Sequence, residues 1–520
     1  MSDNRILFKV DDAIELADRL RELTGKTDKF PASELASRYN AYYGKIKEEL
    51  FSTHTGKIYS VKIPKFASNQ TTTCIKMDDN ANLTASPSTD SFLGQDDYVN
   101  IPLFRWYDCN YVRDANGHAS PTAIKGFDSW YTTSGDVDVG VIQMTPYIKW
   151  DESNSEYTIL SISDTAHDGF TPWPTAVSGG EVYPYVIHSK YISGLVDGLP
   201  RSQPNLIPDT ASYESIMNLY PKKGIGYRGA GAERNSWQII FMLIKYATKS
   251  SQAYFAGCVN YCYQYAAATE RTELDTYFPL TAAQAATIVV GSRVSIGYST
   301  STSDTPIRGS TADSYASSAK VLKIENNNVY LDCDPFSTAK VNDKAIYLTT
   351  MPWASGSTDV LPAMRDGSLY SNTNSKMPYR IQGIEYMNGQ YICASDVAMV
   401  VNASQEYEIF VYAPGTARST SATTIRTAAT SIGTIPVTKT CHIGDITLDV
   451  ATGVTYPSAA GSGSATGYGD YFYRETSLTN GTCREWLMCG ALWNGSGDGA
   501  SLLGLSVGLG YRYWDCAAAD

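Results

Sequence analysis

The sequence predicts an α+β fold built in several parts, and three observations support this. Short stretches rich in β-branched residues and tyrosine alternate apolar and polar side chains, which is typical of strands. Two stretches, 212–219 and 237–247, instead place apolar residues at helical spacing. The 520 residues are also too many for one ordinary hydrophobic core, so several domains are expected.

Residues 1–50 predict a short N-terminal helical hairpin. Val10, Ala13, Ile14 and Leu20 recur at helical spacing, with acidic residues in the first turn and a glycine after the last. A second apolar stripe begins near residue 33. Two helices of this length are too small to be stable alone, so we expect this segment to pack on a partner chain.

Residues 51–278 predict a domain of short strands around a buried helix. The stretch 237–247, WQIIFMLIKYA, is apolar nearly all round, which predicts a helix in the core. Clusters such as DANG and DESNS mark the turns between strands. By their alternation, strands are expected at 58–64, 98–104, 136–144 and 157–163.

Residues 279–350 predict a small all-β module, a barrel or sandwich, inserted between two halves of one domain. Strand patterns occupy 288–297 and 320–336, and Asn326-Asn327-Asn328 supplies a turn within the second. Two low-complexity loops rich in Ser and Thr, 297–305 and 311–318, are expected to be solvated connectors. Strand-like order then resumes in residues 351–520.

Composition and charge exclude several classes of function. The net charge of −12 does not give the basic surface that phosphate-backbone binding needs, so no nucleic-acid partner is expected. No run of about 18 apolar residues occurs, so no membrane insertion is expected. The N-terminus lacks the apolar centre of a signal peptide, which indicates folding in a cytosol, where the ten cysteines should stay reduced. HExxH, Walker, GxSxG and GxGxxG motifs do not occur, so the usual signatures of enzymes are absent.

The C-terminal run 481–516 joins two kinds of composition. Large apolar residues between Arg484 and Trp493 predict a buried strand. Beyond them, Gly, Ser, Asp, Tyr and Trp mix without a period, and the glycines exclude a long helix. Tyr and Trp supply contact area while Ser and Gly allow fit, so this composition is typical of an adaptable binding surface. A half-buried strand carrying Tyr511, Tyr513 and Trp514 is the alternative interpretation.

Two parts of the sequence resemble known families. Residues 16–36, LADRLRELTGKTDKFPASELA, resemble the segment that opens many phage tail proteins. Residues 383–397, GIEYMNGQYICASDV, and 484–503, REWLMCGALWNGSGDGASLL, resemble C-type lectin domains of the formylglycine-generating-enzyme type. Within that group, the C-terminal part is similar to the variable proteins diversified by phage retroelements, which include the phage major tropism determinant.

The resemblance implies a fold and a place of action. It implies a C-type lectin fold formed by 51–278 and 351–520, interrupted by the small all-β inserted module and preceded by the N-terminal helical hairpin. It also implies a homotrimeric receptor-binding protein at the tip of a phage tail fibre, part of the virion and assembled in the cytoplasm of the bacterial host. Residues 1–50 would attach it to tail or baseplate proteins.

The same resemblance implies a binding site without catalytic residues, cofactor or metal. A hypervariable surface within 481–516 would contact a bacterial surface receptor, either protein or glycan. Trp486 and Trp493 would be scaffold. Carried onto this sequence, the ligand-binding positions are Asn494, Asp498, Ser501, Leu503, Leu505, Ser506, Val507, Gly508, Tyr511, Tyr513, Trp514 and Asp515.

Three other functions are weighed against adhesion. A structural tail or baseplate component would pack the aromatic C-terminus on a neighbouring subunit. A formylglycine-generating oxidase needs two copper-binding cysteines after the Trp-containing strand, but Cys483 and Cys489 lie within or before it and Cys516 alone follows, so we reject this function. A polysaccharide hydrolase would need paired carboxylates across a groove, and no sequence repeat indicates the solenoid typical of tail spikes.

Overall fold

The described part of the chain is mainly β-sheet. The computed structural model describes residues 50–87, 94–208, 215, 218–229, 231–255, 257–258, 261–298, 312–360, 376–386, 389–474, 478–488, 505–508 and 516–517. Strands make up 39% and helices 11% of it, with three α-helices in these ranges: α4 (Ala232–Tyr246), α5 (Ala282–Ala285) and α6 (Ala422–Ala428). The expected α+β fold with a C-type lectin arrangement is therefore wrong. The expected hairpin of residues 1–50 lies outside the described residues except for its last position.

The fold class was wrong because the described part of the chain has one long helix and many more paired strands than expected. Helical periodicity produced one long helix, α4, whose 15 residues are all buried, as predicted for 237–247. The other expected helix, 212–219, lies largely outside the described residues and is followed by a 3-10 turn, η3 (Tyr220–Lys222). Elsewhere, short β-branched and tyrosine-rich segments pair with one another, because strands of five or six residues suffice once neighbours are available.

Two antiparallel sheets form from the first part of the chain. The strand predictions at 58–64, 136–144 and 157–163 are confirmed, whereas 98–104 is a turn with a 3-10 helix, η1 (Pro102–Phe104), because proline lacks the N–H a strand needs. One sheet has the order β2 (Ile75–Asp78), β1 (Ile58–Pro64), β7 (Tyr157–Ser163), β6 (Tyr147–Asp151), β8 (Thr171–Pro172). The other has the order β11 (Tyr185–Ser189), β5 (Asp138–Met144), β3 (Trp106–Arg113), β4 (Ala119–Ile124).

Short elements connect these sheets to the rest of the chain. They are η2 (Pro174–Ala176) and the two-stranded pairs β9 (Val177–Ser178) with β10 (Glu181–Val182), β12 (Gly194–Val196) with β13 (Leu199–Arg201), and β20 (Tyr379–Ile381) with β21 (Ile384–Tyr386).

The C-terminal part of the chain forms a larger sheet and a smaller one. The larger sheet has the order β25 (Thr430–Ile435), β24 (Tyr407–Val411), β23 (Val397–Val401), β29 (Cys483–Met488), β22 (Tyr391–Cys393), β31 (Cys516–Ala517), and β30 (Leu505–Gly508) pairs with β29. The smaller sheet has the order β27 (Val454–Ala460), β26 (Cys441–Asp449), β28 (Tyr471–Phe472). All pairs in these two sheets are antiparallel except β22 with β31.

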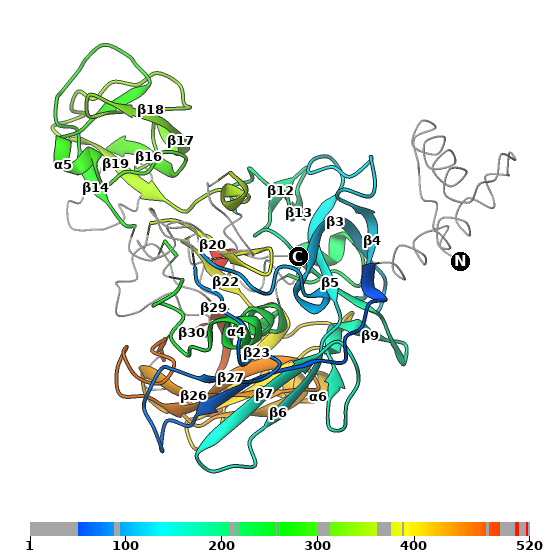
Figure 1. Cartoon of the computed structure of the whole chain (residues 1–520). Helices are drawn as coiled ribbons and strands as arrows, with labels where there is room; N and C mark the ends of the chain where they lie inside the picture. Colours follow the sequence, from blue (N-terminus) through cyan, green and yellow to red (C-terminus); the bar gives the residue numbers. More distant parts are fainter. Residues whose placement is uncertain are drawn as a thin grey trace, which may run out of the picture.

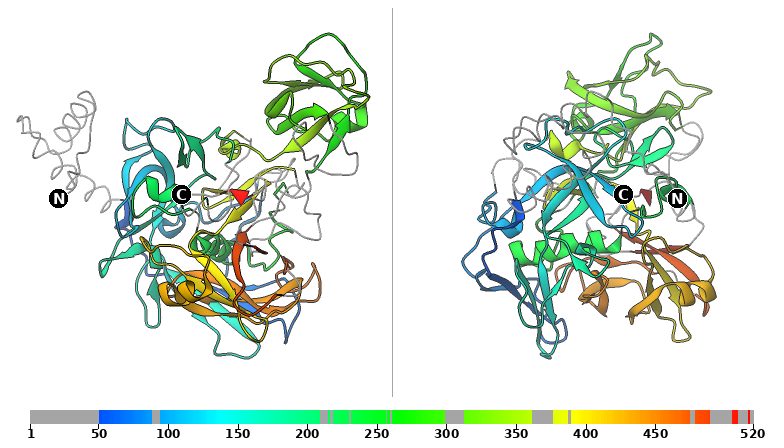
Figure 2. Two further views of the ribbon diagram at one scale, coloured as in Figure 1. Left: turned by 180° about the vertical axis from the view of Figure 1, so that it is seen from behind. Right: turned by 90° about the vertical axis from the view of Figure 1, so that its right-hand side faces the viewer.

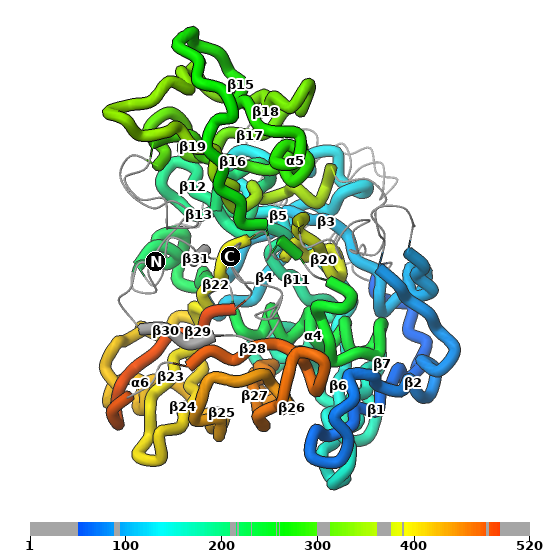
Figure 3. Tube along the Cα trace, turned by 90° about the vertical axis from the view of Figure 1, so that its left-hand side faces the viewer, coloured from blue at the N-terminus to red at the C-terminus, as the bar shows by residue number. Residues whose placement is uncertain are grey.

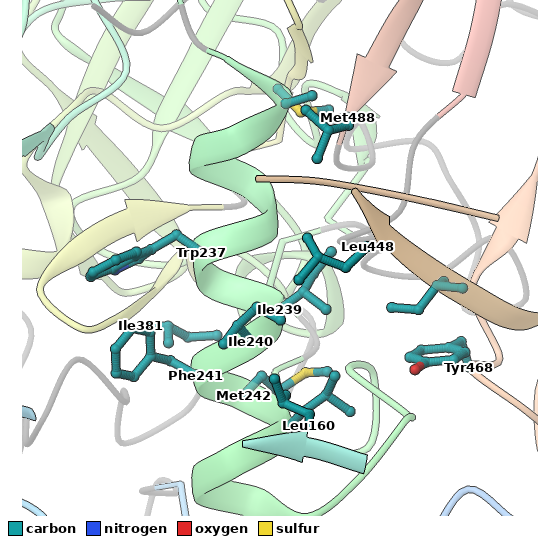
Figure 4. Packing of buried hydrophobic residues seen from close by; sticks show 14 of the residues in the cluster. Leu160, Trp237, Ile239, Ile240, Phe241, Met242, Ile381, Leu448, Tyr468 and Met488 are labelled. Carbon is teal, nitrogen blue, oxygen red and sulfur yellow. The ribbon is translucent and has the colours of Figure 1, made fainter. Parts of the chain in front are cut away.

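Helix α4 lies at the centre of the main hydrophobic core. One cluster of buried residues runs from β1 and β7 through α4 to β23, β26 and β29. Around the helix, Trp237 and Phe241 face Ile381, whereas Leu448 and Tyr468 pack on the opposite side (Figure 4). The first and last thirds of the chain therefore share one core, and neither would bury its sheets without the other.

The inserted module has a core of its own. Its sheet has the order β14 (Gln264–Ala266), β19 (Ile346–Met351), β16 (Arg293–Tyr298), β17 (Ala316–Glu325), β18 (Asn328–Leu331), β15 (Tyr277–Pro279). A separate buried cluster lies inside it. The module stands away from the main body in Figure 1 and forms the upper end of the molecule in Figure 3. Because β14 and β15 belong to this sheet, the module begins before the expected residue 279. Asn326 and Asn327 both have positive φ, which makes the predicted β17–β18 turn.

A buried ionic network holds the chain where it leaves the module. Asp359 Oδ1 is 2.9 Å from Lys190 Nζ and 2.7 Å from Arg380 Nη1. Burial raises the pKa of Asp359, but the charges of Lys190 and Arg380 together with hydrogen bonds from Tyr191 and Lys190 bring it below its usual value. Just before Asp359 in the chain, the backbone N–H groups of Gly356 and Thr358 donate hydrogen bonds to Glu385 of β21 at 2.9 and 3.0 Å.

Candidate ligand-binding surface at the C-terminal sheet

Strand β29 is the element that supports the sequence-predicted site. Its apolar residues Trp486, Leu487 and Met488 are all buried, which explains why this segment forms an inner strand. On one edge, β29 pairs with β23 through Arg484 and with β22 through Leu487. On its other edge it pairs with β30 over the same residues.

The strands that precede and follow the predicted site, β29 and β31, both pair with β22. Ile392 pairs with Met488 in antiparallel fashion and with Ala517 in parallel fashion. Neighbouring strands lie about 4.8 Å apart, so these two residues are about 10 Å from each other. Met488 and Cys516, the described residues that flank positions 489–515, therefore both belong to strands that pair with β22, and β30 pairs with the other edge of β29.

The turn between β22 and β23 fixes this sheet to the core helix. Helix α4 begins after Gly231, which has no side chain to cap it, and Asp396 Oδ1 accepts the N–H of Ala232 at 2.8 Å instead. Burial raises the pKa of Asp396, against the nearby arginines and this hydrogen bond. Arg418 Nε donates to the carbonyl of Ser395 at 2.9 Å, which holds the same turn from its outer side.

The predicted contact residues are placed only in part. Leu505, Ser506, Val507 and Gly508 form β30, where their backbones pair with Leu487, Trp486, Glu485 and Arg484 in that order. Trp486, expected as scaffold, has 3% of its surface exposed and belongs to the main core. The remaining positions lie outside the described residues: Trp493, Asn494, Asp498, Ser501, Leu503, Tyr511, Tyr513, Trp514 and Asp515.

The most chemically suggestive buried pair is His188 with Glu233. His188 Nε2 lies 3.0 Å from Glu233 Oε1, and the same oxygen accepts the indole N–H of Trp173. Burial raises the pKa of Glu233, but the charge and hydrogen bond of His188 and the bond from Trp173 bring it below its usual value. The carboxylate is thus used in protein contacts, and the pair joins β11 and η2 to the first turn of α4.

Cys483, one of the cysteines weighed for copper binding, is a poor metal ligand. Cys483 in β29 is 8% exposed, and burial raises the pKa of its thiol. Copper binds the thiolate form, which this environment disfavours. Cys489 lies outside the described residues, so the oxidase alternative gains no argument from Cys483.

Two features of the structure were missed from the sequence. Lys190 forms ion pairs with Asp108 and Asp359, which lie 82 and 169 positions from it in the sequence. No local spacing indicates such contacts. The run Lys149-Trp150-Asp151-Glu152 was legible as an aromatic residue among charges, and it lines a cleft beside the smaller C-terminal sheet. No motif in or near this run distinguishes it from an ordinary surface segment.

The sequence matches no protein-family model and no curated protein. None of the helices in the described ranges is both long and apolar enough to cross a membrane.

Proposed function

We propose that this protein is a receptor-binding adhesin of a phage tail, which contacts a bacterial surface molecule through residues 494–515. The observation that carries the proposal is the double pairing of Ile392 with Met488 and Ala517. A segment rich in Gly, Ser, Tyr and Trp is thereby held at both ends by one inner strand. Binding by such a segment costs less conformational entropy than binding by a free tail.

Support for a stiff base comes from the packing beneath the segment. Every residue of β23 is buried, as are all residues of β29 except Arg484. Asp396 connects the turn before β23 to α4. Side-chain variation in 494–515 would then alter the contact surface without disturbing the core, which is what an adhesin with a variable surface requires.

The tail context rests on the resemblance of residues 16–36 to the opening segment of phage tail proteins, and the threefold arrangement rests on the resemblance of the C-terminal part to phage variable proteins. Several copies on one particle would convert a modest affinity per site into firm attachment, because each later contact is made at high effective concentration. The second candidate function, a structural tail component, would instead bury residues 489–515 against a neighbouring subunit.

The two functions are separated by a binding assay with the purified full chain. The fluorescently labelled protein is incubated with a panel of bacterial strains, and the bound fraction is measured by flow cytometry. The variant Tyr511→Ser/Tyr513→Ser/Trp514→Ser should lose binding to the strains that the parent protein labels. The matched control is Phe127→Ser, which removes an aromatic side chain that is 40% exposed in the turn after β4, away from the C-terminal sheet.

Labelling that survives in the triple variant would contradict the site, and the absence of labelling on every strain would favour the structural alternative. In that case, the triple variant should instead reduce incorporation of the chain into tail particles.

A further inference from the structure

A cleft lies where the first and last thirds of the chain meet, at the end of the molecule opposite the inserted module. Figure 1 shows strands β6 and β7 close to β26 and β27 at that end, and Figure 2 shows the same cyan and orange segments at the lower end from two further sides. The cleft has a volume of about 350 Å³ and is lined by consecutive residues 148–153 of β6 and its turn, by Gly169 and Thr171, and by Val450 from the β26–β27 turn. Glu152 Oε2 accepts the hydroxyl of Thr447 at 3.0 Å, which fixes the two sides to each other.

The lining includes hydrogen-bond acceptors and donors that can form further hydrogen bonds to a ligand. Asp151 Oδ1 accepts the N–H of Ser153 at 3.0 Å, and hydrogen bonds from Ser153 lower the pKa of Asp151, so it is ionised at neutral pH. Among the described residues, the ammonium group of Lys149 has no ion pair. The backbone of the turn is held by Lys65, whose Nζ donates to the carbonyls of Glu152 and Asn154 at 3.0 and 2.6 Å.

The aromatic member of the lining is Trp150. It is half-buried, packs partly on the main core and also lines the cleft, so its indole is fixed in place. An indole ring offers a flat apolar surface beside the charged groups. The residues that line the cleft thus carry one indole ring, two carboxylates and one ammonium group within six consecutive positions.

We propose that this cleft binds a short neutral saccharide. Sugar hydroxyls would donate to Asp151 and Glu152 and accept from Lys149, while the C–H face of a pyranose ring packs on Trp150. Two carboxylates against one ammonium group disfavour phosphate and other anions. The volume is near the lower end of the range of about 300–1,000 Å³ for small-molecule sites, which suits about one or two sugar rings.

Other ligand classes fit the lining less well. A metal ion would need more oxygen ligands than two carboxylates supply, and no group of three His, Cys, Asp or Glu side chains in the described ranges could hold one. A purely apolar ligand would leave the charged groups desolvated and unpaired. The proposal extends beyond the C-terminal surface, because β6 and the β26–β27 turn belong to different sheets from β29 and β30.

The test is saturation-transfer NMR on the full chain with the methyl glycosides of glucose, galactose, mannose and N-acetylglucosamine. At least one glycoside should receive saturation from the protein. The variant Asp151→Asn/Glu152→Gln should weaken its binding about tenfold or more, since a hydrogen bond to a charged group is worth roughly that factor.

The matched control is Glu156→Gln, which neutralises an exposed carboxylate on the same β6–β7 turn outside the cleft. It should bind as the parent protein does. Unchanged thermal unfolding of each variant shows that the fold is kept. The proposal is overturned if no glycoside receives saturation, or if the double variant binds as well as the control. Neither result depends on residues 494–515, so the adhesin proposal is tested separately.

Discussion

Lys190 Nζ lies 2.9 Å from Asp359 Oδ1, and the same ammonium group lies 2.9 Å from Asp108 Oδ2. One buried charge therefore connects the sheet that contains β3 and β11 to the chain that returns from the inserted module. The Lys190 side chain is 3% exposed, so its charge is stabilised by these two carboxylates rather than by water.

Replacing Lys190 with methionine should lower the free energy of unfolding by up to about 3–5 kcal/mol, because Asp108 and Asp359 would lose the buried charge between them and keep only the more peripheral Lys125 and Arg380. Denaturant titration measures the change. The control is Lys125→Met: Lys125 also contacts Asp108, at 3.3 Å, but its side chain is 63% exposed. That change should cost less than about 1 kcal/mol. If the two variants lost equal free energy of unfolding, the burial of Lys190 would not explain its contribution to stability.

The stability of the core should depend on pH through Asp470. Asp470 is buried, and burial raises its pKa to about 7, although hydrogen bonds from Ser251 and Gln252 lower it. The native state therefore holds a proton that the unfolded state releases near pH 4, and this contribution to stability is lost as the pH rises toward 7. Relative to Asp470→Asn, the parent protein should lose about 2–3 kcal/mol between about pH 5 and pH 8.

The measurement is a set of denaturant titrations of both proteins across that pH range. Asp334→Asn, a change at an exposed aspartate of the inserted module, is the control and should run parallel to the parent. If Asp470→Asn also runs parallel to the parent, the carboxyl group is already ionised in the folded protein.

Trp486 should tolerate phenylalanine better than alanine. Its side chain is buried in the main core, yet its Nε1 has no hydrogen-bond partner in the part of the chain that the structure describes. Alanine leaves a cavity and should cost about 3–5 kcal/mol. Phenylalanine also removes the unpaired N–H, whose burial costs about 1–3 kcal/mol, so its net effect should be much smaller. Thermal unfolding of the two variants tests the order, and equal losses would imply that Nε1 is satisfied in solution.

Local features of the fold were predictable because their causes are local. The turn at Asn326 and Asn327 needs two residues that accept positive φ, and asparagine does. Helix α4 was recognisable because an apolar surface all round is rare outside a core helix. The strand expected at 98–104 failed at Pro102, where the proline should have weighed more than the alternation.

Features that depend on distant pairing were not predictable. The fold class was wrong because short β-segments reveal neither their partners nor how many will pair. The candidate surface was predicted from composition, but its anchorage through Ile392 joins residues nearly a hundred or more positions apart. The bond from Asp396 to Ala232 spans 164 positions, and no pattern near either residue indicates it.

That bond gives the last prediction, which concerns how firmly the C-terminal sheet is held. Asp396→Ala removes the acceptor for the Ala232 N–H and should cost about 0.5–2 kcal/mol, the usual value of a helix cap. Because the same turn joins β22 to β23, backbone amides of β22, β23 and β29 should also exchange with deuterium faster.

Asp396→Asn is the matched variant, since its side-chain oxygen can still accept the Ala232 N–H. Its amide group also replaces Asp396 Oδ2, which has no hydrogen-bond partner among the described residues. Exchange should therefore stay close to that of the parent protein. Hydrogen exchange followed by mass spectrometry resolves the peptides that contain Ile392 and Met488. Faster exchange confined to α4 in the alanine variant would mean that the helix and the sheet are held independently, and the support proposed for residues 494–515 would then rest on strand pairing alone.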